Sequence, residues 1–422
     1  MDFRAVKGTR DFYPDEMRVR NWIADAWRRV SLRNGFEEYD SPIFEYLDLF
    51  TVKSGEEIAG QLFGLVDRGG RHLAIRPEIT PSLARMVNAR INSLPRPIKW
   101  FSIPRLCRAE KPQRGRLREF FQWNVDVIGS DSVLADAECI FVAVDFLREA
   151  GLAPEDVCVR IGSRPLTAAA LAAAGVPAER TEAVLPALDK RPKVSDEEFR
   201  KLAAGVGMSD EQIDAVCRFQ DCTEIDAVAE LLSGREGAAE QIDCVKELMA
   251  TLEAMNVADY CVLDMRIVRG LAYYTGVVYE VFGRGESLRA VAGGGRYDNL
   301  LEVLGGPALG ATGFGMGDVV LAILLEQKGK LPEVAQRLDF FVIDAEASAL
   351  GTVMKVVGAL RAAGFSADFS YKRQPIGKQL KEANRRGAAR AVLVREDRVA
   401  VKDMATGDQH DRPLAEFLDS PI

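Results

Sequence analysis

The stretch Ile103–Asp126, IPRLCRAEKPQRGRLREFFQWNVD, has apolar residues near both ends and a polar turn between them. Strand-forming residues on either side of a turn that contains Pro112 and Gly115 predict a β-hairpin. The turn and its borders carry six cations: Arg105, Arg108, Lys111, Arg114, Arg116 and Arg118.

A solvated basic loop is the simplest explanation of such a charge run. Here, however, carboxylates and an amide alternate with the cations, namely Glu110, Glu119, Gln122 and Asp126. Arginine binds phosphate and carboxylate groups through two parallel hydrogen bonds. We therefore predict that this hairpin holds a polyanion and a zwitterion together.

The composition limits the class of protein. A chain of 422 residues predicts two or three domains. The net charge of −8 argues against DNA as a partner, although it leaves room for a local basic face that binds RNA. The sequence shows no signal-like segment and no apolar run long enough for a bilayer, so we expect no membrane partner and a cytoplasmic location.

Histidine and cysteine usage narrows the chemistry. The chain has only His72 and His410, and its seven cysteines are scattered without a CxxC pair. This excludes most zinc sites and makes Ser-His-Asp or Cys-His catalysis a poor fit, and we expect no resident metal site. The chemistry must then depend on carboxylates, arginines, a bound metal ion or the groups of the substrate itself.

Three further segments carry candidate site residues. Glu78 and Thr80 lie in RPEITP, at a predicted strand-to-helix junction, where a solvated carboxylate and an N-cap explain each residue taken alone. Strand character at Val262–Val268 leads into RGLAYYTG, residues 269–276. Three glycines then precede Arg296, which predicts close backbone approach to a ligand or a strand kink.

The rest of the chain predicts two more structural units. Residues from about 163 to 255 are Ala-, Glu- and Leu-rich helical segments without a catalytic grouping, which indicates a helical insertion. After a polar linker, alternating strands and helices predict a compact α/β domain with a largely parallel sheet. The second helix of that domain carries Lys378, Lys381 and Arg385, for which a solvated face and an RNA contact are equally good explanations.

Glycine- and arginine-rich segments without a nucleophile, base or metal cluster fit adenylate formation. In that reaction the substrate carboxylate attacks the α-phosphate of ATP, and the enzyme aligns the reactants and neutralises charge with arginines and Mg²⁺.

The motifs can be placed in chain order. They are KGTRDFYPDEM (7–17), SPIFEYLDLF (41–50) with Pro42, CRAEKPQRGRLREFFQWNVDVIG (107–129), RGLAYYTGVVYE (269–280), AGGGRYDNL (292–300) and GATGFGMGDVVL (310–321). In this order they resemble the N-terminal helix, motifs 1 and 2, the two histidine signatures and motif 3 of the histidyl-tRNA synthetases, which are class II aminoacyl-tRNA synthetases. The resemblance covers essentially the whole chain.

The resemblance implies an α+β fold: a class II antiparallel sheet with flanking helices, a helical insertion at about 163–255, and a C-terminal α/β anticodon-binding domain. It places the catalytic domain at residues 1–328 and the anticodon-binding domain at 336–422. It also implies a homodimer that uses ATP and Mg²⁺ to form histidyl adenylate and then transfers the histidyl group to tRNA(His).

The resemblance implies a role for each site residue. Arg108 would bridge the α-phosphate and the histidine carboxylate, and Arg269 would be the catalytic cation on the α-phosphate. Glu110 and Arg116 would contact ATP, and Arg114 would contact the tRNA end. The ammonium group of histidine would be bound by Glu78, Thr80 and Gln122. The imidazole of histidine would be bound by Asp126, Tyr273 and Tyr274.

Two departures from the family pattern stand out. Ala272 replaces an aspartate of the first signature, and Val319 and Val320 replace the Glu-Arg pair of motif 3, whose arginine holds the γ-phosphate. This departure fits either a subfamily that holds ATP with other cations or a weakened ATP site. We expect the first, with Arg116 or Arg296 as the cation, because the arginines on the α-phosphate side are intact.

Two other functions are compatible with parts of the sequence. One is a non-catalytic paralogue that senses histidine as the regulatory subunit of ATP phosphoribosyltransferase. Such a paralogue would be expected to lose the motif 2 and signature arginines and the C-terminal domain, all of which this chain keeps. The other is a class II synthetase for a different amino acid, which the two histidine signatures disfavour.

Overall fold

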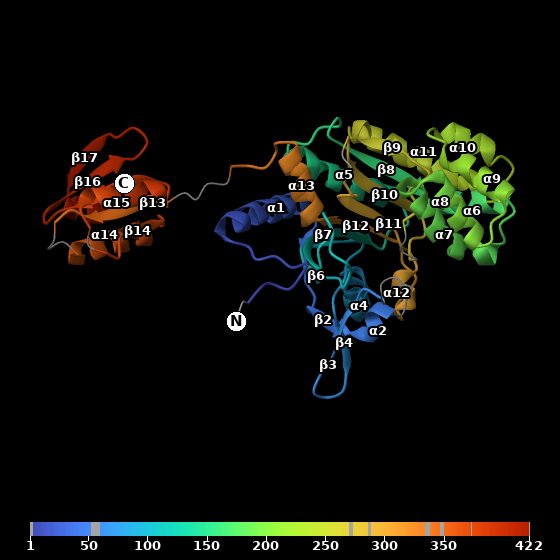
Figure 1. Ribbon diagram of the computed structural model, residues 1–422, viewed down its shortest axis with the longest axis horizontal. Helices are drawn as coiled ribbons and strands as arrows, with labels where there is room; N and C mark the ends of the chain where they lie inside the picture. Colours follow the sequence, from blue (N-terminus) through green and yellow to red (C-terminus); the bar gives the residue numbers. More distant parts are fainter. Residues whose placement is uncertain are drawn as a thin grey trace. The chain divides into compact units, whose positions relative to one another are not determined.

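The computed structural model describes residues 3–51, 60–269, 273–285, 288–333, 338–346, 350–372 and 374–421 (Figure 1). The chain forms two compact units. The larger unit holds Val19–Pro332 with Met1–Phe12, and the smaller holds Glu333–Ile422 with Tyr13–Arg18.

A large sheet forms the centre of the larger unit, and its inner strand pairs are antiparallel, as predicted. Only the edge pairs β1–β5 and β8–β9 are parallel. In sheet order the strands are β1 (Glu37–Glu38), β5 (Ile98–Ser102), β7 (Glu119–Ile128), β12 (Ala311–Gly317), β11 (Ala292–Arg296), β10 (Val277–Gly283), β8 (Val157–Ser163) and β9 (Cys261–Leu263), with β6 (Arg105–Cys107) beside β7.

The predicted hairpin at Ile103–Asp126 is confirmed as β6 and β7, with Arg105 opposite Phe121. The ten-residue strand β7 pairs with β6 at its beginning and with β5 at its end. The loop between β6 and β7 closes with a short bridge between Gln113 and Arg116.

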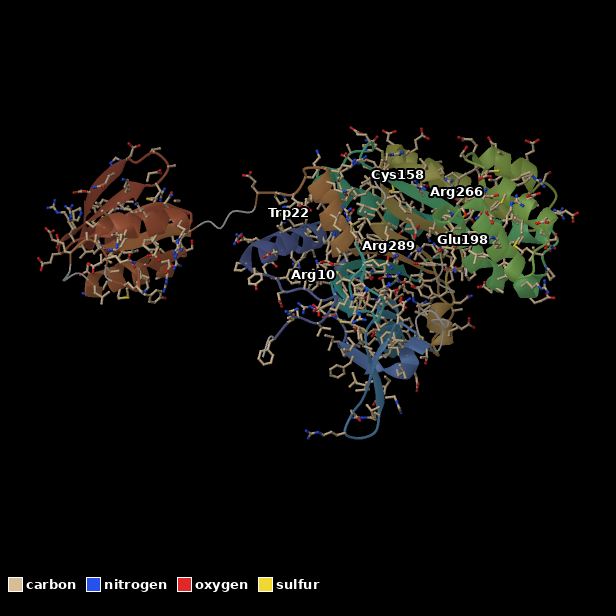
Figure 2. The ribbon with its side chains drawn as sticks, in the orientation of Figure 1. Arg10, Trp22, Cys158, Glu198, Arg266 and Arg289 are labelled. Atoms are coloured by element: carbon tan, nitrogen blue, oxygen red, sulfur yellow. The ribbon has the colours of Figure 1, made fainter. Side chains whose placement is uncertain are left out.

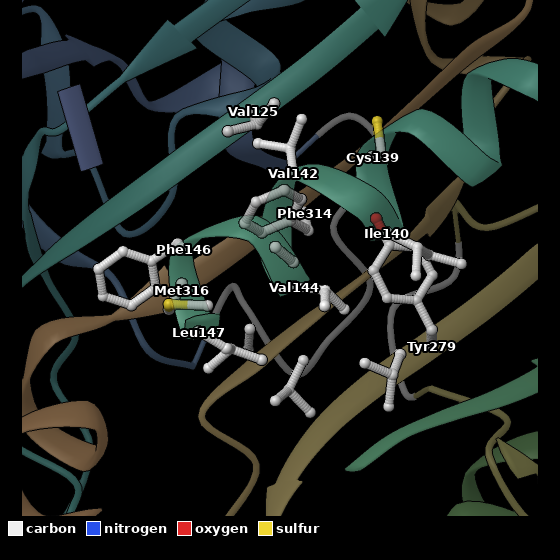
Figure 3. Packing of buried hydrophobic residues seen from close by; sticks show 14 of the residues in the cluster. Val125, Cys139, Ile140, Val142, Val144, Phe146, Leu147, Tyr279, Phe314 and Met316 are labelled. Carbon is white, nitrogen blue, oxygen red and sulfur yellow. The ribbon is translucent and has the colours of Figure 1, made fainter. Parts of the chain in front are cut away.

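One face of this sheet forms the main hydrophobic core (Figure 3). Because side chains alternate along a strand, Trp123 and Val125 of β7, Tyr279 of β10, and Phe314 and Met316 of β12 all lie on this face. Four helices contribute to the same core: α1 (Pro14–Arg33), α5 (Val133–Glu149), α11 (Ala238–Ala254) and α13 (Asp318–Gln327). Because these strand residues point into the core, the residues between them point to the opposite face of the sheet.

The opposite face is covered at one end by α4 (Thr80–Arg90), whose Leu83 and Val87 pack with Ile128 and Val278 of the sheet. The short helix α12 (Leu300–Val303) joins the same cluster. Next to α4 lie α2 (Leu47–Thr51) and a small antiparallel sheet of β2 (Phe44–Tyr46), β4 (His72–Ile75) and β3 (Phe63–Val66).

A group of helices follows β8 in the chain and stands where the helical insertion is predicted (Figure 1, green). Two hydrophobic clusters hold these helices together, and α11 links them to the main core through Leu248 and Leu252. Besides α11, they are α6 (Arg164–Ala173), α7 (Thr181–Lys190), α8 (Asp196–Gly205), α9 (Asp210–Gln220) and α10 (Ile225–Leu231), with 3₁₀ turns at Ala178–Arg180, Arg191–Lys193 and Ala258–Tyr260.

The smaller unit contains a sheet of order β14-β13-β15-β16-β17, of which the first three strands are parallel, as predicted. The last two strands are antiparallel and were not predicted. Its elements are β13 (Leu338–Asp344), α14 (Leu350–Ala362), β14 (Ala367–Phe369), α15 (Ile376–Arg385), β15 (Ala388–Val394), β16 (Arg398–Asp403), β17 (Gln409–Pro413) and α16 (Leu414–Asp419).

Candidate active site

Two predicted site residues, Gln122 and Asp126, lie in the sheet on the face opposite the main core, and Tyr273 and Tyr274 belong to the hydrophobic cluster on that face. On β7 the side chains of Gln122, Asn124 and Asp126 alternate with the core residues Trp123 and Val125 and therefore share this face. Asn124, which is only 5% exposed, was not predicted as a site residue. Its position two residues from both Gln122 and Asp126 indicates that it shares their face of the strand.

Glycines of β11 and β12 make room on this face for other side chains. A Cβ at Gly293 would lie within 3.0 Å of the guanidinium of Arg269, and a Cβ at Gly313 would lie within 3.0 Å of the carboxylate of Asp126. At residues 293–295, where close approach to a ligand or a strand kink was predicted, the side chains of Arg269 and Tyr274 lie directly on the backbone of Gly293 and Gly295.

Asp126 is buried, and the hydroxyl of Tyr297 donates to its Oδ1 at 2.6 Å. Burial raises the pKa of Asp126 to about 7, although the Tyr297 hydrogen bond opposes that rise. Oδ2 is also buried and has no hydrogen-bond partner among the described residues. Tyr297 belongs to the GGGRYD motif but was not predicted to act at the site.

Glu78 is buried beside the two tyrosines of the first histidine signature. The Tyr273 hydroxyl donates to Oε2 of Glu78 at 3.1 Å, and the rings of Tyr273 and Tyr274 are 5.0 Å apart. Burial raises the pKa of Glu78, while the nearby charge of Arg108 lowers it. Thr80 is the first residue of α4 and follows the N-cap Ile79, so it is not the helix cap.

Arg269 has an unusual backbone conformation, with φ of 62°, and its Nη1 donates to Oε1 of Glu280 at 2.5 Å. Its guanidinium lies 5.7 Å from the ring centre of Tyr274. Burial opposes the charged form, yet Tyr274 and Glu280 hold the pKa of Arg269 above its ordinary value. Ala272 and its neighbours Gly270 and Leu271 lie outside the described residues.

Arg108 follows β6, and its Nε donates to the carbonyl of Pro77 at 3.0 Å. Its guanidinium lies 5.2 Å from the ring centre of Phe120, and its positive charge lowers the pKa of Glu78. Farther along the loop Glu110 and Arg116 form an ion pair, and Arg114 is exposed.

Arg296 points to the other face of the sheet. Its Nε and Nη2 donate to Asp136 of α5 at 3.0 and 2.6 Å, and its Nη1 and Nη2 donate to the carbonyls of Ser130 and Ser132. This is the core face, so the structure does not bring Arg296 to the other predicted residues, and we leave it out of the proposed ATP site.

The residues at the motif 3 positions, Asp318 and Val320, contact other segments of the larger unit. Val320 is 8% exposed, and its Cγ2 lies 3.3 Å from the position of a Cβ built on Gly115 in the β6–β7 loop. Asp318, the first residue of α13, accepts from the N–H of Phe121 at 2.9 Å and pairs with Arg10 at 2.6 Å. Arg10, labelled in Figure 2, thereby ties the N-terminal segment to α13.

In the smaller unit, the predicted cations of α15 lie on one exposed surface. Lys378, Lys381 and Arg385 line a groove of about 510 Å³. Its other lining residues are Ser370, Tyr371, Lys372, Gln374 and Glu382. The structure therefore brings the three cations together with an exposed aromatic ring.

Two absences are found within the described ranges. No helix there combines the length and the apolar character that crossing a membrane requires. The same residues contain no group of three or more His, Cys, Asp and Glu side chains arranged to hold a metal ion.

The larger unit matches the family model described as histidyl-tRNA synthetase over residues 8–317, and the smaller unit matches the anticodon binding domain over residues 339–420. A histidine–tRNA ligase of Opitutus terrae is 40% identical over 419 residues, which is 97% of this chain and 96% of the relative. A chloroplastic/mitochondrial histidine–tRNA ligase of Arabidopsis thaliana is 38% identical over 422 residues, which is 99% of this chain and 86% of the relative.

Solved structures show the same fold. The histidyl-tRNA synthetase from Nostoc sp. PCC 7120 has a TM-score of 0.82 at 22% identity, with both chains covered completely. An ATP phosphoribosyltransferase regulatory subunit/histidyl-tRNA synthetase from Bacillus halodurans has a TM-score of 0.75 at 23% identity, with coverage of 90% of this chain and 97% of the other.

The family-model matches and the similarity to histidine–tRNA ligases define the class of this protein as an aminoacyl-tRNA synthetase. Because the family model covers most of the chain and the relatives match along nearly all of it, the chain belongs to the histidyl-tRNA synthetase family. The family predicted from the motifs is confirmed.

Proposed function

We propose that this protein attaches histidine to tRNA(His) in two steps, formation of histidyl adenylate from histidine and ATP and then transfer of the histidyl group to the tRNA. One observation carries the proposal: the buried carboxyl group of Glu78 and the two signature tyrosines lie next to Arg108 and Arg269, and Tyr297, which donates to Asp126, packs against Tyr273. Such a set suits a substrate with an imidazole at one end and a carboxylate at the other.

The imidazole of histidine is assigned to Asp126, Tyr273 and Tyr274. A neutral imidazole has one donor and one acceptor nitrogen, which a carboxylate and a tyrosine hydroxyl satisfy. The buried Oδ2 of Asp126, which has no partner within the described residues, supports this assignment. Apolar analogues would leave these groups unpaired, which selects against them.

The α-ammonium group is assigned to Glu78, Thr80 and Gln122. Glu78 is the buried carboxyl group of this set. Thr80 follows it by two residues and is the first residue of α4. An ammonium group has three donors, which matches three acceptor side chains.

In the activation step an oxygen of the histidine carboxylate attacks the α-phosphorus of ATP. The new O–P bond forms as the bond from the α-phosphorus to the oxygen bridging the β-phosphate breaks, and pyrophosphate leaves with both electrons of that bond. Arg108 bridges the carboxylate and the α-phosphate, and Arg269 neutralises charge that develops on the phosphate oxygens. Mg²⁺ enters with ATP and supplies further charge neutralisation on the phosphates. Glu110 and Arg116 are assigned to the adenine and the outer phosphates.

The γ-phosphate is assigned to Arg116. Val320 cannot provide a cation, and Arg296 is held by Asp136 on the core face. Arg116 lies in the loop that packs over Val320 through Gly115, which supports its role as the replacement.

The tRNA is assigned to two surfaces, each described within its own unit. Arg114 is exposed in the β6–β7 loop and would meet the acceptor end. Lys378, Lys381 and Arg385 line the groove of the smaller unit and would contact phosphates of the anticodon arm. We assign residues 1–328 to catalysis and residues 336–422 to anticodon binding.

A homodimer in the cytoplasm completes the proposal. Five large apolar side chains are exposed on and beside the small sheet, in the motif 1 region and the neighbouring hairpin, and a second copy of the chain would cover them. They are Ile43, Phe44, Tyr46, Leu65 and Val66.

Histidine-dependent exchange of pyrophosphate into ATP tests the proposed function. The purified protein is expected to exchange with histidine and not with other amino acids, and Arg269→Ala is expected to abolish exchange. Histidine binding without exchange would contradict the proposal and favour a histidine-sensing paralogue.

A further inference from the structure

Arg164 is a buried arginine at the junction of the sheet and the helical insertion. It is the first residue of α6, directly after the last residue of β8, and it is 7% exposed. The N-cap Ser163 accepts from the N–H of Leu166, which fixes the start of the helix. The Arg164 side chain is therefore held in place by a structural element that forms none of the substrate contacts assigned above.

The name signature loop is used here for the described residues Arg269, Tyr273 and Tyr274 of the RGLAYY motif. The guanidinium of Arg164 reaches the first and the last of these three residues. Nε donates to the carbonyl of Tyr274 at 3.4 Å, and Nη1 donates to the carbonyl of Arg269 at 3.4 Å. The backbone N–H of Arg164 also donates to the carbonyl of Gly276 at 3.0 Å. One side chain thus joins the two ends of the loop that carries the catalytic arginine and the imidazole-facing tyrosine.

The segment before the loop is anchored in the insertion as well. Val268 is fully buried in the same hydrophobic cluster as residues of α7, α8 and α9, and Met265 is buried in the second cluster of the insertion. Between them, the carbonyl of Ile267 lies so close to Gly162 that a Cβ there would clash with it. Figure 2 labels Arg266, which belongs to this segment.

The backbone of Arg269 requires such support. With φ of 62° it occupies the left-handed region, which residues other than glycine rarely adopt. Strained residues of this kind persist only where the surrounding structure determines their conformation. The insertion supplies contacts on both sides: Val268 precedes Arg269, and Arg164 binds its carbonyl.

We propose that the helical insertion positions the signature loop for adenylate formation, with Arg164 and Val268 as its positioning residues. The inference rests on the proposed function, because that function gives Arg269 and Tyr274, which these two residues position, their roles in substrate binding. Neither residue needs to touch a substrate. Loss of the contacts of Arg164 or Val268 moves the Arg269 guanidinium away from the α-phosphate. This movement lowers kcat more than it raises the KM for ATP.

The first test compares Arg164→Lys with Arg191→Lys. Arg191 is a matched control, because it is a partly buried arginine of the insertion whose hydrogen-bond partners among the described residues are Cys217, Gln220 and Asp221. Lysine keeps the charge but cannot bind two carbonyls as a guanidinium does. Arg164→Lys is expected to lower kcat of pyrophosphate exchange on the order of 10- to 100-fold. Arg191→Lys is expected to leave kcat unchanged.

The second test keeps the proposal falsifiable if Arg164→Lys folds poorly. Val268→Ala and Val216→Ala remove the same atoms from the same cluster, and both valines are fully buried. Similar losses of thermal stability are expected for the two variants, but only Val268→Ala should reduce kcat. Equal kcat values for the two alanine variants, or equal losses for the two lysine variants, would overturn the proposal. Failure of the unmodified protein to exchange would instead contradict the proposed function itself.

Discussion

Nη1 of Arg269 lies 2.5 Å from Oε1 of Glu280, on the face of the sheet that is free of the main core. The two side chains are 20% and 12% exposed, so water screens their attraction only in part. Glu280 stands opposite Gly293 in the strand register, and the missing side chain at Gly293 leaves the space in which the guanidinium lies. The guanidinium of Arg269, the proposed catalytic cation, is therefore positioned by the carboxylate of Glu280 and by the space at Gly293.

Replacement of Glu280 by glutamine is expected to lower kcat of pyrophosphate exchange by about tenfold, because an amide holds the guanidinium less firmly than a carboxylate does. The KM for histidine is expected to change little. Glu149→Gln is the control, since Glu149 pairs with Arg29 and Arg33 on the outer surface. An equal loss of activity in both variants would argue that only general stability is affected.

Replacement of Gly293 by alanine is expected to abolish most exchange activity while thermal stability changes little. The three atoms nearest to the added methyl group would all belong to the guanidinium of Arg269, which is the end of a flexible side chain. Gly358→Ala is a suitable control, because a Cβ at that position of α14 meets nothing within 4 Å. Exchange at the rate of the unmodified protein in Gly293→Ala would show that Arg269 does not act from the position seen here.

The buried carboxyl group of Asp126 makes stability depend on pH. Its pKa is raised to about 7 in the folded protein, so the folded state holds the proton between roughly pH 4 and pH 7 while the unfolded state has lost it. This contribution to stability is fully present below pH 4, falls as the pH rises, and is lost above pH 7. The whole effect is on the order of 4 kcal/mol.

Asp126→Asn removes this titration and keeps an acceptor for the Tyr297 hydroxyl. The stability difference between Asp126→Asn and the unmodified protein is expected to grow from pH 4 to pH 7 in favour of the variant and then to level off. Urea unfolding at pH 5, 6 and 8 measures it. A difference that is constant across these values would contradict the raised pKa.

Replacement of Val320 by arginine is expected to impair exchange rather than improve it, although it restores the motif 3 residue of the family. Val320 is packed beneath Gly115, so a longer side chain would displace the β6–β7 loop. Arg116→Ala is expected to raise the KM for ATP by at least tenfold. A large gain in activity from Val320→Arg would contradict the assignment of the γ-phosphate to Arg116.

Charge reversal at Lys381 and Arg385 is expected to raise the KM for tRNA(His) without an effect on pyrophosphate exchange, because these side chains line a groove of the smaller unit. Lys355→Glu changes an exposed lysine of α14 in the same unit and serves as the control. If the double reversal and the control weaken charging equally, α15 has no special role in RNA binding.

Local chemistry explains why the fold class and most of the site were predictable. The hairpin of β6 and β7 follows from apolar strands around a loop with Pro112 and Gly115, and the motifs name the arginines, carboxylates and tyrosines directly. Longer-range contacts explain the differences. Strand character at Val262–Val268 yields a strand only to Leu263, because Met265 and Val268 turn away to pack in the insertion.

By itself, the sequence determined the family, the paired strands and the alternation that sends Gln122, Asn124 and Asp126 to one side of β7. It could not say which side of the sheet the helices cover, because that depends on contacts between distant parts of the chain, such as the one between Trp27 and Trp123. The tertiary structure decided that the helices cover the side of Trp123. On that side Arg296 pairs with Asp136, whereas Arg269 lies on the opposite side. It also decided that Arg164, in a part of the chain without catalytic motifs, lies against both ends of the signature loop.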